Sequence, residues 1–90
     1  MSIDVRHPHA LPADQARKAI DEVAAKLAER FGLQTQWRGD QLDFSGSGVD
    51  GAIELQPGAV RVTAKLGFLL SAMKGMVEGE IQRVLKEKLG

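Results

Sequence analysis

The chain has 90 residues, 43% of them hydrophobic and 27% charged, which is typical of a single soluble globular domain spanning residues 1–90. Twelve basic residues balance twelve acidic ones, so the basic excess that is usual in nucleic-acid binders is absent. Cysteine is absent too, which excludes disulfides, a thiol nucleophile and cysteine-ligated metals. No signal-peptide pattern and no apolar run of about 20 residues occurs, so we expect a cytoplasmic protein without a membrane span.

Two patterns follow one another in the first third of the chain. Residues 2–7 alternate, with Ile3 and Val5 on one side, and this predicts a strand with one buried face. A helix is predicted from Pro12 to Phe31, because apolar residues recur there every three or four positions and Gly32 follows as a stop. The apolar stripe consists of Ala16, Ile20, Val23, Leu27 and Phe31.

Residues 33–66 alternate with a period of two and carry no helical stripe. Four short runs predict an antiparallel meander: 33–38, 41–45, 52–56 and 60–66. The runs are separated by Gly39-Asp40, by the glycine-rich connection Gly46–Gly51 and by Pro57-Gly58. One face of this sheet is predicted to be apolar and therefore covered, and it carries Trp37, Leu42, Phe44, Ile53, Leu55, Val60 and Val62.

The helical period returns between about Leu69 and Leu89. The predicted core stripe of this second helix is Leu70, Met73, Val77, Ile81, Val84 and Leu85. The element order is therefore β-α-β-β-β-β-α. It predicts an α+β two-layer sandwich, with a mainly antiparallel five-stranded sheet and two helices on one face.

Residues that carry chemistry are few, and we assign no catalytic residue, no metal ligand and no cofactor. Gly46–Gly51 matches G-x-G-x-x-G, but a strand is predicted after it, whereas a dinucleotide site needs a helix there; a hairpin is the simpler interpretation. His7 and His9 offer two imidazoles, yet structural zinc normally takes four ligands. We interpret these histidines as residues at the end of a strand.

An apolar edge, defined as Phe68, Leu69, Ala72 and Met76, flanks the core stripe of the second helix. It has two interpretations. It is either part of a broad buried face or a surface left for a second subunit or another hydrophobic partner. Flexible methionines suit adaptable contacts of the second kind.

In the order and spacing of several segments, the chain resembles the polyhydroxyalkanoic acid system protein family over nearly its whole length. The resemblance rests on Ile3–His9, Trp37–Asp40, Leu42, Phe44, Gly48–Gly51, Ile53, Val62–Leu70, Glu78, Glu80 and Ile81. It implies a link with bacterial polyhydroxyalkanoate storage, and it carries no catalytic residues over to this chain.

The resemblance and the apolar edge together predict a non-catalytic accessory protein of polyhydroxyalkanoate storage. It would bind at the granule surface or to a granule-associated protein, and a homodimer through the same edge is an open alternative. Two rival functions stay open. One is a small domain that holds an acyl or other hydrophobic ligand between sheet and helices, and the other is an enzyme that uses His7 or His9.

Overall fold

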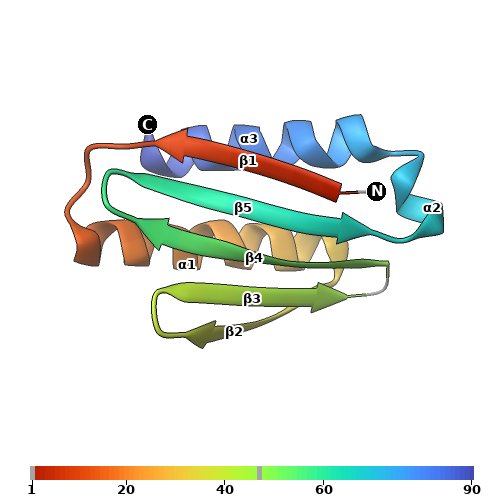
Figure 1. The fold of residues 1–90 in the computed structure, drawn as a ribbon, viewed down its shortest axis with the longest axis horizontal. Coiled ribbons are helices and arrows are strands. Elements are labelled where there is room, and N and C mark those ends of the chain that lie inside the picture. Colours follow the sequence, from red (N-terminus) through yellow and green to blue (C-terminus); the bar gives the residue numbers. More distant parts are fainter. Residues whose placement is uncertain (1, 47) are drawn as a thin grey trace.

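The computed structural model describes residues 2–46 and 48–90, apart from the side chain of Leu69, as a sheet with helices on one face (Figure 1). The strands are β1 (Ser2–Pro8), β2 (Gln34–Arg38), β3 (Gln41–Gly46), β4 (Val49–Gln56) and β5 (Ala59–Leu66). The helices are α1 (Ala13–Phe31), the short α2 (Phe68–Ser71) and α3 (Lys74–Leu89). The predicted α+β class is confirmed.

The sheet has the strand order β1-β5-β4-β3-β2, and each neighbouring pair is antiparallel. The first strand of the chain therefore pairs with the last one, and β2 forms the opposite edge. The register aligns one apolar row across all five strands, and this row consists of Val5, Val62, Ile53, Leu42 and Trp37. This row faces the helices, which is where a one-sided sheet needs cover.

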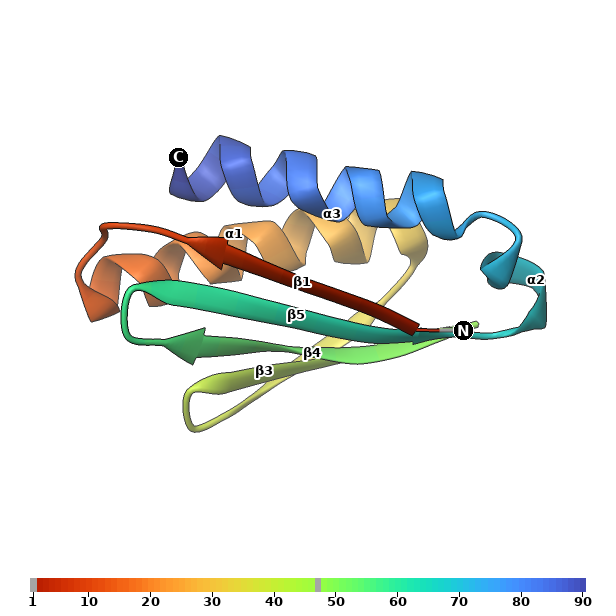
Figure 2. The same ribbon diagram turned by 45° about the horizontal axis from the view of Figure 1, so that its top comes forward.

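The helices α1 and α3 lie side by side on the sheet and run in opposite directions (Figure 2). Helix α1 contacts β4, β3 and β2, whereas α3 contacts β1. The edge strand β2 is attached to α1 by Trp37, whose Nε1–H donates to Asp21 at 2.7 Å while Arg17 stacks 3.9 Å from its ring centre. Gly32 ends α1 in the left-handed conformation, as its position after the apolar stripe predicts.

The prediction of one continuous helix between Leu69 and Leu89 is wrong, because the structure divides this segment into α2 and α3. The backbone of Met73 is not helical (φ −109°, ψ 19°), and its N–H bonds to the carbonyl of Leu70. The side chain of Met73 therefore does not follow the stripe of α3. It is 42% exposed, although its spacing predicts a core residue.

The glycine-rich connection is shorter than predicted, since β4 already begins at Val49. Val49 is buried and pairs with Gly46, which closes a tight hairpin in which Gly48 has a φ of 92°. Gly51 lies within the strand beneath the ring of Phe44. Because a strand and not a helix follows the motif, the hairpin interpretation of G-x-G-x-x-G is confirmed.

Ion pairs join the exposed sides of the two long helices. Glu80 accepts a hydrogen bond from Arg83, its Oε1 lies 3.1 Å from Nε of Arg30, and Oε1 of Glu87 lies 2.6 Å from Nζ of Lys26. The hydrogen bond from Arg83 is the main cause of the lowered pKa of Glu80, and Lys26 has the same effect on the pKa of Glu87. The carboxylates are partly exposed, so each pair contributes little alone.

Acid is expected to destabilise this helix layer. A lowered folded-state pKa means that the unfolded chain binds protons more readily, so the contribution is present above about pH 4.5 and disappears as the pH falls below it. Urea unfolding at pH 7 and pH 3 measures this effect. Between the two pH values, the free energy of unfolding should decrease less for Glu80→Gln than for the wild type. Glu29→Gln, at an exposed position of α1, is the control, and an equal loss in all three proteins would contradict the prediction.

Candidate functional site

Helix α2, the start of α3 and the segment between them carry an apolar tip, defined as the exposed side chains of Phe68, Met73 and Met76. Phe68 is 92% exposed, Met76 56% and Met73 42%. Among the residues that the structure describes, these are the exposed large hydrophobic side chains, and all lie within nine consecutive positions. Helix α2 lies beyond the end of β5, so the tip occupies one end of the molecule (Figures 1 and 2).

The apolar edge expected from the sequence overlaps with this tip. Phe68, Ala72 and Met76 are exposed, while the side chain of Leu69 lies outside the described residues. Met73 joins them, although its helical spacing had assigned it to the core. Met73 lies at the break between α2 and α3, and a periodic pattern alone does not reveal such a break.

Local hydrogen bonds hold the tip in shape. Ser71 donates from its backbone N–H to the carbonyl of Gly67 at 2.9 Å and from its hydroxyl to the carbonyl of Phe68 at 2.8 Å. Both donors of Ser71 are thus used in hydrogen bonds to the backbone at the start of α2. The only charged residue between Gly67 and Val77 is Lys74, so the tip combines apolar side chains with one positive charge.

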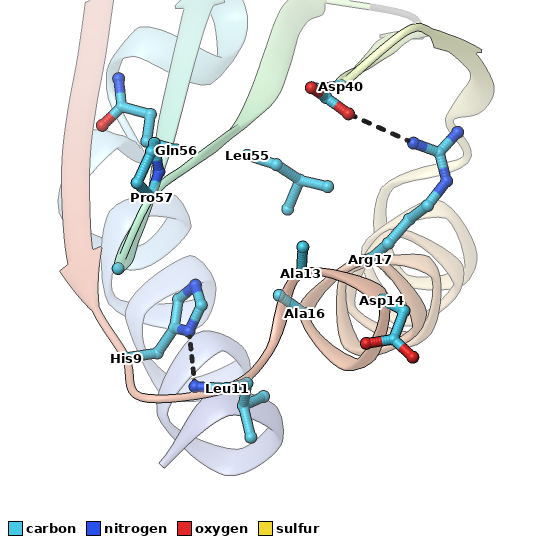
Figure 3. A pocket seen from close by; sticks show the side chains of 11 residues that line it. His9, Leu11, Ala13, Asp14, Ala16, Arg17, Asp40, Leu55, Gln56 and Pro57 are labelled. Carbon is cyan, nitrogen blue, oxygen red and sulfur yellow. Dashed lines mark hydrogen bonds and ion pairs between the residues drawn. The ribbon is translucent and has the colours of Figure 1, made fainter.

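A pocket of about 410 Å³ lies at the opposite end of the molecule, beside the start of α1 (Figure 3). His9 forms one wall, and Ala13 and Ala16 of α1 face it, with Leu55 above them (Figure 3). The rim includes Arg17, whose Nη1 lies 3.7 Å from Asp40. The remaining lining comes from Leu11, Asp14 and the β4–β5 turn, Gln56–Gly58.

Sequence reasoning missed this pocket, although a signal for it was present. In an antiparallel sheet, alternate connections lie at the same end. The residues after β1, the β2–β3 turn at Asp40 and the β4–β5 turn at Pro57 are such connections, and all three contribute to the lining. What the pattern does not reveal is that their side chains leave a space between them.

The imidazole of His9 has one satisfied and one unsatisfied nitrogen. Its Nδ1 accepts a hydrogen bond from the backbone N–H of Leu11 at 3.0 Å, and its own backbone N–H donates to the carbonyl of Gly58 at 3.0 Å. Because Nδ1 acts as an acceptor, the proton of the neutral ring is on Nε2. That Nε2 is buried and has no hydrogen-bond partner in the described part of the chain.

The two histidines do not converge on a common centre. The Nε2 of His7 lies 3.3 Å from the carbonyl oxygen of Gly90, whereas His9 belongs to the pocket. Asp14 and Asp40 share that pocket with His9, but the ring bonds to Leu11 rather than to either carboxylate. In residues 2–46 and 48–90, no three His, Cys, Asp or Glu residues are grouped as metal ligands would be.

The space between sheet and helices is nearly filled. A crevice there has a volume of only about 10 Å³, and its lining is Leu27, Phe31, Leu33, Phe44, Val49, Leu70, Val77 and Ile81. A space of this size holds one water molecule at most. This crevice therefore leaves no room for an acyl chain between the two layers, which is where the sequence placed a hydrophobic ligand.

Two basic residues on the outer face of the sheet are paired with carboxylates. Arg61 donates two hydrogen bonds to Asp4, at 3.0 and 2.6 Å, and Arg38 donates to Asp43. The hydrogen bond from Arg61 is the main cause of the lowered pKa of Asp4, and Arg38 has this effect on the pKa of Asp43. Because Asp4 and Asp43 offset these two arginines, the face is not a uniformly basic platform.

Across the two described ranges, no helix combines the length and the apolar character that crossing a bilayer requires. The family model described as "Putative polyhydroxyalkanoic acid system protein" matches residues 3–89. Among proteins with curated functions, none matches the chain. The family match covers both ends of the molecule, the apolar tip and the pocket alike, and the chain belongs to this polyhydroxyalkanoic acid system protein family.

Proposed function

We propose that this protein is a non-catalytic, cytoplasmic accessory protein of bacterial polyhydroxyalkanoate storage, and that its apolar tip binds the polyester surface of the granule. The observation that carries the proposal is the exposure of Phe68, Met73 and Met76 within one short segment. Exposed apolar side chains that cluster in this way are typical of a surface that contacts a hydrophobic partner. Membership of the family connects that partner with polyhydroxyalkanoate.

The shape of the tip favours a polymer surface over a folded partner. Helix α2 and the start of α3 lie at one end of the molecule (Figure 1), and the three side chains of the tip are exposed there, so a broad apolar surface can cover them together. Full burial of a Phe or Met side chain contributes roughly 1.5–3 kcal/mol. Two methionines add flexibility, so that the contact does not need a complementary pocket. A granule-associated protein and a second copy of this chain are the alternative partners.

Removing the apolar character of the tip is expected to abolish granule binding without unfolding the protein. Purified wild type and Phe68→Ser/Met76→Gln are mixed with protein-free polyester particles and with native granules, and both are sedimented. Loss of two apolar contacts should weaken binding at least tenfold, since about 1.4 kcal/mol corresponds to tenfold. The unfolding midpoint should change little, because both side chains are largely exposed in the free protein.

The matched control is Phe68→Leu/Met76→Leu, which changes both side chains but keeps them apolar. It should bind like the wild type. If the polar variant bound as tightly as the wild type, the tip would not be the binding surface. Binding to native granules but not to bare polyester would instead identify a granule protein as the partner. Analytical ultracentrifugation of the same variants would show whether the tip also mediates dimerisation.

A further inference from the structure

The edge strand β2 has one side that faces away from the sheet. In the described part of the chain, β2 pairs with β3 alone, and Figure 1 shows it as the last strand of the sheet. In an antiparallel ladder, hydrogen-bonded and non-hydrogen-bonded residue pairs alternate. Because the N–H of Leu55 in β4 bonds to the carbonyl of Asp40 at 2.9 Å, Leu42 and Phe44 are the residues of β3 that bond to β4.

This alternation determines which backbone groups of β2 point outward. The remaining residues of β3 bond to β2, so Asp43 exchanges hydrogen bonds with Gln36, its partner in the register. Thr35 and Trp37, on either side of Gln36, therefore direct their N–H and C=O groups away from β3. A row of such groups is a template for pairing with another strand.

Strand β2 lacks the features that usually prevent pairing at an edge. These features are proline, charged side chains and bulges. The opposite edge strand, β1, ends at Pro8 and carries Asp4 and Arg6. In contrast, β2 contains no proline, its register with β3 runs without a bulge, and its single charged residue is Arg38 at its last position. The unprotected edge of the sheet is therefore β2.

The sequence of β2 is complementary to a second copy of itself. Two β2 strands that pair antiparallel about Gln36 place Thr35 of one copy opposite Trp37 of the other, so the outward N–H and C=O groups of these residues bond to each other. Each Arg38 then lies opposite Gln34 of the second copy. The two arginines are at least about 13 Å apart, four positions at roughly 3.3 Å each, so like charges do not meet.

The side chain of Trp37 is suited to such an interface. It is half-buried, its Nε1–H already donates to Asp21, and Arg17 stacks on its ring. A second chain can therefore cover the exposed part of the ring without leaving the indole N–H unpaired. An aromatic side chain opposite a β-branched one, here Trp37 opposite Thr35, stabilises a sheet.

We propose that two copies of this chain associate through β2 into one continuous antiparallel sheet, with the two-fold axis at Gln36. The helices of both copies lie on the same face of this sheet. An interface of one short strand from each copy belongs to the weak class, below about 1,200 Å². The apolar tip lies away from β2, so the dimer does not depend on the proposed granule contact (Figure 1).

Opposite charges at the two-fold axis test this pairing. Analytical ultracentrifugation extends to about 1 mM chain, because an interface of this class is weak, and it should show a monomer–dimer equilibrium for the wild type. Gln36→Lys and Gln36→Glu should each weaken dimerisation at least tenfold, since two like charges then lie opposite each other. An equal mixture of the two variants should dimerise at least as tightly as the wild type, because an ammonium group then faces a carboxylate.

Two controls separate β2 from other surfaces. Gln82→Lys makes the same change at an exposed position of α3 and should leave dimerisation unchanged. Phe68→Ser/Met76→Gln, which removes the apolar character of the tip, should leave it unchanged too. Dimerisation that is lost in the tip variant and kept in Gln36→Lys would place the second copy on the tip and overturn the proposal.

Amide hydrogen exchange measured by NMR reports the register. Protection of the Thr35 and Trp37 amides should rise with chain concentration, whereas the Gln36 amide, which already bonds to β3, should change little. A chain that stays monomeric over the whole concentration range would overturn the proposal. The same conclusion would follow if the mixture of Gln36→Lys and Gln36→Glu did not associate, or if the Thr35 and Trp37 amides gained no protection in the dimer.

Discussion

Gly51→Ala is expected to lower the free energy of unfolding by about 3 kcal/mol, a typical upper value for a core that is forced to accept extra volume. A Cβ at this position would lie 2.1 Å from the carbonyl oxygen of Thr63 and 2.7 Å from the ring of Phe44. The first contact is with the backbone of β5, the strand that pairs with β4. It cannot be relieved by turning a side chain, so the central part of the sheet has to shift.

Gly79→Ala is the matched control, and it should raise the free energy of unfolding. Gly79 lies in the interior of α3, and nothing occupies the space within 4 Å of its added Cβ. Alanine is better than glycine there by about 1 kcal/mol, because it restricts the unfolded chain and favours the helix. Urea unfolding of the wild type and the two variants measures both changes in the free energy of unfolding, provided that the three proteins have the same m-value. A neutral Gly51→Ala would show that β4 and β5 are not packed as closely as described.

Leu85→Ala is expected to cost about 3 kcal/mol, within the range of 2–5 kcal/mol that is usual for leucine in a core. Leu85 is completely buried on the inner side of α3 and belongs to the hydrophobic core. A domain of this length has a total stability of roughly 5–13 kcal/mol, so the loss would be a large part of it. Thermal and urea unfolding should both show a large decrease in the midpoint.

Leu70→Ala tests whether α2 is as important as α3. Leu70 is only half-buried, and it packs against the core from the short helix and approaches Gly48. Truncation at such a position removes less buried area, so we expect a loss of about 1 kcal/mol. If Leu70→Ala were as destabilising as Leu85→Ala, α2 would be part of the cooperative core. The polar substitutions at the tip would then need a new stability control.

The apolar tip and the pocket occupy opposite ends of the molecule, with the long axis of the sheet between them (Figure 1). A protein that lies with its tip on a polyester surface would leave the pocket near His9 open to solvent.

Local patterns in the sequence determined the fold class. Alternation with a period of two predicted all five strands, and the stripe from Ala16 to Phe31 predicted α1 within two residues of its observed bounds. These patterns work because a strand or helix with one buried face must repeat its apolar residues with the period of its backbone. The apolar face of the sheet followed from the same rule, down to the row that contains Ile53 and Val62.

The tertiary structure decided what depends on contacts between distant residues. It paired β1 with β5, placed Gly51 under Phe44 and brought three separate connections together around His9. It also ended α2 before Met73, which moved that residue from the expected core to the surface. A period reports the local geometry of one segment, whereas pairing, close approach and exposure at a junction depend on how segments far apart in the sequence pack together.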